Sequence, residues 1–151
     1  MLRQMCEKHF KNSRKGKEVI NMGLDMYAFS VKKENRIDTF HIKHDENVKE
    51  LHYWRKHPNL HGWFEELYYY KGGEAEIFDC VYVEISLKDL EDLEYDIRNH
   101  TLPETMGFFF GKDEEHISDE LNEDDLDDLE FIEKARKIIN QGDHVYYYSW
   151  W

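Results

Sequence analysis

A change of apolar period at Ser86 sets the fold class of this chain. Residues 77–85 place their branched apolar side chains on one face of an alternating segment, as in a strand. Residues 87–97 then carry Leu and Ile at helical spacing. Ser86, with Asp89 three residues later, is a weaker relative of the Ser-x-x-Glu capping box and predicts the helix start. A strand that runs directly into a helix predicts a domain of mixed helix and sheet.

Further strands are predicted at 24–33, 37–42, 106–111 and 144–151, from alternation or from short apolar runs between turn residues. The predicted fold is a single α+β domain over residues 22–151. Its sheet has about four or five mostly antiparallel strands, and three helices pack on one face.

Two more helices complete this prediction. The first is capped at Asp45 or Asn47, is kinked or split at Pro58, and ends at Gly72. The second spans residues 120–140, with acids early and bases late, as the helix dipole favours. Its expected core positions are Leu121, Leu126, Leu129, Ile132, Ala135 and Ile139.

Residues 1–21 show neither helical nor strand periodicity and carry six basic side chains. Gly16-Lys17-Glu18-Val19 can be encoded by GGN-AAG-GAG-GTN, which contains a complement of the 3′ end of bacterial 16S ribosomal RNA. Met22 follows two codons later. We therefore predict that residues 1–21 are a translated ribosome-binding site, a non-native or disordered extension. The alternative is an ordinary basic arm.

Four segments carry a family resemblance. They are Met22–Tyr27 ("MGLDMY"), Trp54-Arg55-Lys56 with His61 and Trp63-Phe64, Leu102-Pro103 with Gly107–Gly111, and Tyr146–Trp151. With them, the chain from Met22 resembles a family of small uncharacterised bacteriophage and prophage proteins that open with "MGLDMY". The resemblance covers nearly all of 22–151, implies a phage or prophage origin and supplies no catalytic residues. Pro58 departs from the uninterrupted helix that the family pattern implies.

Composition excludes several function classes. No apolar run approaches the roughly 18 residues of a membrane span, and no apolar segment follows the basic N-terminal residues as in a secretory signal. Cys6 and Cys80 lie far apart and support neither a disulfide framework nor a zinc pattern. The protein is therefore expected in the cytoplasm, with no membrane partner. If the phage resemblance holds, this is the cytoplasm of the bacterial host.

Residues 113–133 contain twelve acidic side chains and no Lys or Arg. Such a surface repels nucleic acid, so direct DNA or RNA binding is not expected. The alternatives are a solvated helix face and a surface that binds a partner protein. In the second case, the carboxylates imitate a phosphate backbone and occupy the nucleic-acid site of a basic host protein. The predicted partner surface consists of Asp124, Asp125, Asp127 and Asp128.

An aromatic and cationic group around residues 53–63 is the second candidate site. Flat rings can stack on a base, and Arg or Lys can hold a phosphate. The predicted ligand is a small anionic, nucleotide-like molecule, and the alternative is aromatic packing in the core. The candidate ligand-binding residues are Trp54, Arg55, His61 and Trp63.

Metal and catalytic motifs are absent from the sequence. His57 and His61 have i, i+4 spacing, but Pro58 lies between them, so we expect His57 at a helix start and no metal site. The acidic run lacks the glycine of a calcium loop. No nucleophile, phosphate-loop or cofactor motif is found, so neither a cofactor nor a catalytic residue is predicted. Catalysis itself stays open, because a catalytic site need not leave a local motif.

Two single residues have alternative interpretations. Asp25 is the one acid in an apolar stretch, either a buried charge partnered by a residue such as Arg55 or the solvent-facing residue of an edge strand. Cys80 falls in a predicted strand, where it is expected to be a small buried hydrophobe.

Overall fold

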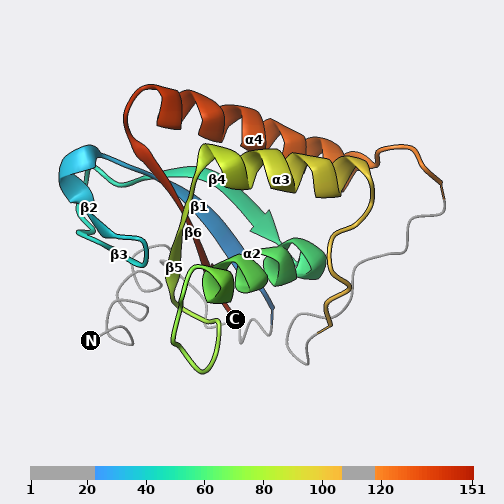
Figure 1. Ribbon diagram of the computed structural model, residues 1–151, viewed down its shortest axis with the longest axis horizontal. Helices are drawn as coiled ribbons and strands as arrows, with labels where there is room; N and C mark the ends of the chain where they lie inside the picture. The colour runs from blue at the N-terminus through green and yellow to red at the C-terminus, as the bar shows by residue number, and fades with distance from the viewer. Residues whose placement is uncertain (1–22, 107–117) are drawn as a thin grey trace, which may run out of the picture.

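The computed structural model describes residues 23–106 and 118–151. The predicted extension at 1–21, residues 107–111 of the strand predicted at 106–111, and the acids at 113–115 lie outside the described residues. Within the described part of the chain, three α-helices, a four-stranded sheet and a two-stranded sheet form a single compact α+β domain (Figure 1).

The four-stranded sheet has the order β4-β1-β6-β5, and every pairing is antiparallel. Its strands are β1 (Asp25–Val31), β4 (Lys49–Arg55), β5 (Tyr82–Ile85) and β6 (His144–Trp150). The segment between β1 and β4 forms η1 (Lys33–Asn35) and a small hairpin of β2 (Arg36–Asp38) and β3 (His41–Ile42). The first and last strands therefore pair at the centre of the sheet.

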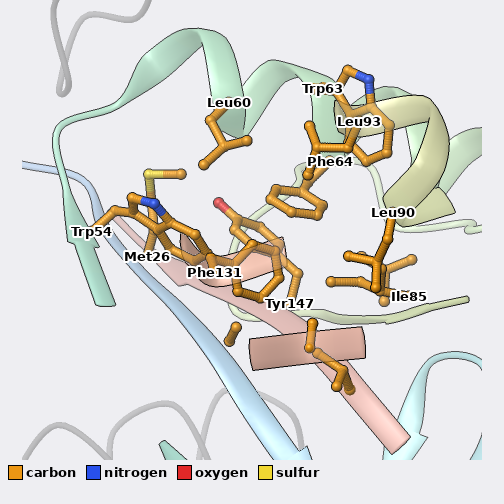
Figure 2. Close-up of a cluster of buried hydrophobic side chains, with 14 of the residues drawn as sticks. Met26, Trp54, Leu60, Trp63, Phe64, Ile85, Leu90, Leu93, Phe131 and Tyr147 are labelled. Carbon is orange, nitrogen blue, oxygen red and sulfur yellow. The ribbon is translucent and has the colours of Figure 1, made fainter. Parts of the chain in front are cut away.

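The helices are α2 (Pro58–Tyr70), α3 (Leu87–Arg98) and α4 (Glu123–Asn140). All three contribute to one apolar cluster with the inward side chains of the sheet, so they cover the same face. α3 and α4 run side by side (Figure 1). Figure 2 shows this core, in which Phe64 of α2 stacks on Tyr147 of β6 with ring centroids 4.0 Å apart. The predicted α+β class and the helices on one face are confirmed.

The helix predicted from residue 45 or 47 is wrong in its first half. Residues 49–55 form β4, in which His52 and Trp54 point inward while Tyr53 and Arg55 are exposed. Leu51, Trp54 and His61 fit helical spacing in the sequence, but the first two lie on β4 and the third lies on α2. Pro58 begins α2 at its first turn, where the missing N–H costs nothing, as the split-helix alternative predicted.

Two other strand predictions need correction. Residues 37–42 form the β2–β3 hairpin and not one strand, because Asp38 accepts the Phe40 N–H and turns the chain. The strand predicted from Ile77 begins only at Tyr82, and Ile77 itself is exposed. Cys80 is half-buried in the irregular segment before β5, with a φ of 55°, and is not a core strand residue.

Within the described residues, no helix combines the length and the apolar character needed to cross a membrane.

Candidate functional site

Strand β4 supplies one side of the most polar region of the core. Because side chains alternate along a strand, His52 and Trp54 share the face that meets the helices. Both are buried, with 8% and 4% of their surface exposed. Two residues beyond the strand end, His57 is the N-cap residue of α2. Three polar ring systems thus lie along one short segment.

Helix α4 supplies the other side. Asn122 and Asp125 form a capping box: Asn122 Oδ1 accepts the Asp125 N–H at 2.8 Å, and Asp125 Oδ2 accepts the Asn122 N–H at 2.9 Å. From this start, helical spacing places Asp125, Asp128, Ile132 and Ala135 on the buried stripe. Two carboxylates therefore occupy inward positions in the first half of α4.

His52, Trp54, His57, Asp127 and Asp128 form a histidine–aspartate cluster between β4 and α4. Trp54 Nε1 donates to Asp128 Oδ1 at 2.9 Å, and His57 Nε2 lies 2.8 Å from Asp128 Oδ2. His52 Nε2 lies 3.0 Å from Asp127 Oδ2. Both oxygens of the buried Asp128 carboxylate therefore have a ring nitrogen as partner.

The tautomer of His52 follows from its second contact. Lys134 Nζ lies 3.4 Å from His52 Nδ1, and an ammonium group can only donate. His52 Nδ1 is therefore the acceptor, and Nε2 carries the proton that is donated to Asp127. In this arrangement the imidazole connects a lysine to a carboxylate.

Burial raises the pKa of the Asp128 carboxyl, while its hydrogen bonds with His57 and Trp54 oppose that effect. No surface of Asp128 is exposed, so the side chain reaches no solvent-borne partner directly. Beside the cluster, Lys56 adopts a φ of 54°, a left-handed conformation that is strained for a residue with a side chain. These features make the cluster a rigid clamp between β4, α2 and α4.

The predicted partner surface is divided by this clamp. Asp124 is exposed and Asp127 is about half exposed, so both lie on the outer side of α4. Asp125 and Asp128 are buried, at 3% and 0% exposure, because one caps the helix and the other is held by the cluster. Their inclusion in a surface was therefore wrong.

The predicted ligand-binding residues do not converge around a cavity. Trp54, His61 and Trp63 are all in the core (Figure 2 labels the two tryptophans), so the alternative of core packing holds for them. Their polar atoms are engaged: Trp63 Nε1 donates to Asp96 at 2.9 Å, and His61 Nδ1 lies 2.7 Å from the Tyr147 hydroxyl. Arg55 points to the opposite side of β4 and is exposed.

Burial lowers the pKa of His61 to about 4, so this histidine is neutral at pH 7 and accepts the Tyr147 proton. His57 lies at the helix start, as expected from Pro58. Its contact with Asp128 of α4 was not predicted. Within residues 23–106 and 118–151, no three His, Cys, Asp or Glu side chains are placed to hold a metal ion.

Asp25 is a buried charged residue, and the edge-strand interpretation is wrong. β1 is a central strand, paired with both β4 and β6, and only 3% of Asp25 is exposed. The Tyr53 hydroxyl donates to Asp25 Oδ1 at 2.5 Å, and Arg55 lies opposite Asp25 in the register of the two strands.

Sequence reasoning missed His52 and the link between the two candidate regions. One signal was present: Asp125 and Asp128 fall at helical spacing with Ile132 and Ala135, so an amphipathic helix that buries those two apolar residues also buries the carboxylates. Buried carboxylates need partners, and the nine histidines of the sequence are candidates for that role.

Comparisons of the chain with protein-family models, with curated proteins and with solved structures found no match.

Proposed function

We propose that the protein is a non-enzymatic accessory protein that binds a basic partner protein through the outer face of the first half of α4. We call this the α4 acidic face and define it as Glu123, Asp124, Leu126, Asp127, Glu130 and Glu133. A phage or prophage origin, and hence a bacterial host protein as the partner, belongs to the same proposal.

The observation that carries the proposal is that several of these outward acidic side chains are exposed and form no ion pair with another described residue. Within the described residues, Glu123, Asp124 and Glu133 make no ion pair, so their charges are not neutralised by the fold. Leu126 lies among them with 57% of its surface exposed. Charges that the fold leaves unneutralised give this face a negative potential, which can steer and orient a basic partner.

The clamp makes this surface rigid. The capping box fixes the first turn of α4, and Asp128 ties the second turn to Trp54 and His57. Side chains held on a preorganised helix lose less conformational entropy on binding than side chains on a loop. The buried aspartates thus support binding without contacting the partner.

The charge pattern favours a partner with a basic surface. Residues 118–133 contain nine acidic side chains and no Lys or Arg. Phosphates along a DNA backbone present a comparable density of negative charge. A basic site that normally accepts nucleic acid is therefore the complementary surface, and binding there would block that site.

The test compares two triple variants that remove the same charge. Glu123→Gln/Asp124→Asn/Glu130→Gln changes the α4 acidic face, whereas Glu50→Gln/Glu66→Gln/Glu91→Gln changes three exposed acids on β4, α2 and α3. The full chain and both variants are used to capture proteins from a bacterial lysate, and the affinity of a captured protein is then measured with purified components. We expect the first variant to weaken binding by about tenfold or more and the second to leave it near the wild-type value.

Duplex DNA provides the second readout. If the α4 acidic face occupies a nucleic-acid site, DNA should displace the captured protein, and added salt should weaken the complex. Equal loss of binding in both triple variants would show a net-charge effect and reject the surface. A partner that binds DNA and this protein at the same time would reject mimicry of the phosphate backbone.

A further inference from the structure

A hollow of about 430 Å³ lies between the β2–β3 hairpin and the segment that follows α2. It is remote from the histidine–aspartate cluster and shares no residue with it. Its volume falls within the roughly 300–1,000 Å³ that is usual for small-molecule sites. Most of its lining is apolar, with Phe40 from the hairpin, Tyr68 from α2, and Ala75 and Val81 from the connection to β5.

The aromatic walls of this hollow are held in place. The rings of Phe40 and Tyr68 meet edge to face, with centroids 5.1 Å apart. The Tyr68 hydroxyl accepts the Ala75 N–H at 3.1 Å. Gly73 packs so tightly that a Cβ there would lie 2.2 Å from the Tyr68 ring, so only glycine fits at that position. A flat ring can therefore enter without reordering its walls.

The polar groups at the hollow favour a cation. His41 Nδ1 lies 2.9 and 3.1 Å from the two oxygens of Asp38, so Nδ1 donates a proton to that carboxylate. The Phe40 N–H, which donates to Asp38, is the main cause of the lowered pKa of that carboxyl, so Asp38 is ionised at pH 7. Asp38 does not itself line the hollow, whereas the Glu74 carboxylate does, and no Lys or Arg is among the described residues that line it.

We propose that this hollow binds a small aromatic cation, a flat ring that carries an ammonium group. The ring lies against Phe40 and Tyr68, and the ammonium group lies near the Glu74 carboxylate. The inference goes beyond the proposed function and does not depend on it, because the α4 acidic face contributes nothing to this site.

The experiment is a titration of the full ¹⁵N-labelled chain, followed by amide chemical shifts. The probes are 2-phenylethylamine, the neutral analogue 2-phenylethanol and the anionic analogue phenylacetate. We expect saturable shifts at Phe40, His41, Ala75 and Val81, with the amine bound about threefold or more tighter than the alcohol and the acid weakest. Equal affinities, the reverse order, or shifts confined to α4 would overturn the proposal.

Two matched variants distinguish the effect of a carboxylate at the hollow from the effect of the protein's net charge on binding. Glu74→Gln removes the carboxylate at the hollow, whereas Glu76→Gln removes an exposed carboxylate that does not line it. We expect Glu74→Gln to weaken the amine about two- to threefold and to leave the alcohol unchanged, and Glu76→Gln to change neither. The triple variant of the α4 acidic face should bind the amine normally. Equal effects of Glu74→Gln and Glu76→Gln would reject the site.

Discussion

Trp54 donates its indole N–H to Asp128 across 2.9 Å, and this hydrogen bond joins the edge strand β4 to helix α4 inside the core. The two residues belong to regions that the sequence had suggested as separate sites, an aromatic pocket and an acidic surface. Their contact shows that both regions hold α4 against β4. The buried Asp128 carboxylate fixes this helix, and the outer side of the same helix carries the unpaired acids.

Asp128→Asn is expected to destabilise the protein by about 1–3 kcal/mol, because the buried carboxylate accepts hydrogen bonds on both oxygens and an amide can accept on only one. Asp128→Ala should cost more, about 3–5 kcal/mol, since it also leaves Trp54 Nε1 and His57 without their acceptor. Urea unfolding of the full chain measures both values.

The matched control is Asp124→Asn, four residues earlier on the outer side of α4. It should change the free energy of unfolding by no more than about 0.5 kcal/mol. Similar effects at positions 124 and 128 would contradict the clamp.

The start of α4 depends on the capping box. Asn122→Ala is expected to cost about 1 kcal/mol, because the Asp125 N–H loses its acceptor. Asn122→Ser keeps a side-chain oxygen at the cap and should recover most of that loss. Circular dichroism during urea unfolding checks both variants, and an alanine variant as stable as the serine variant would show that the cap contributes nothing.

The sequence predicted the elements whose pattern is local. Ser86 begins α3 through a capping box with Asp89, and Pro58 occupies the first turn of α2, because a cap and a missing N–H act within a few residues. The strands at both ends of the domain were also predicted, since the first alternates and the last is a short aromatic run that follows Gly142.

The histidine–aspartate cluster could not be predicted in the same way. Its inward residues on β4 include His52, which does not count as apolar, so the strand lost its alternation and was assigned to a helix. On α4, the buried positions include Asp125 and Asp128 while Leu126 is exposed, which reverses the usual rule for an amphipathic helix. Only the tertiary contact with Trp54 and His57 explains why carboxylates lie inward.

Acid should destabilise the protein through His61. Burial lowers the pKa of this imidazole to about 4, below the value of about 6.5 in an unfolded chain, so the unfolded state binds more protons between these values. The contribution of His61 is fully present above pH 6.5 and is lost as the pH falls towards 4. It amounts to about 3 kcal/mol and is measured by urea unfolding at a series of pH values.

His61→Asn isolates this effect, since its side-chain oxygen can replace Nδ1 as the acceptor of the Tyr147 hydroxyl without binding a proton. The difference in stability between pH 7 and pH 4 should be smaller in this variant by about 3 kcal/mol. An unchanged pH dependence in His61→Asn would show that His61 is not the titrating group.

Gly62 lies where α2 meets the segment before residue 107. A Cβ at Gly62 would lie 1.9 Å from Thr105 Oγ1 and 2.9 Å from Thr105 Cβ, and Thr105 is held there because its amide donates to Asn59 Oδ1 at 3.0 Å. Alanine stabilises a helix relative to glycine by about 1 kcal/mol, but the clash should outweigh this gain. We therefore expect Gly62→Ala to destabilise the protein by about 1–3 kcal/mol.

The double variant Gly62→Ala/Thr105→Gly lacks the clashing side chain. Its loss of stability should therefore be smaller than the sum of the two single losses by about 1 kcal/mol or more. Urea unfolding of the three variants gives this coupling energy, and additive effects would show that α2 and Thr105 are not packed as described.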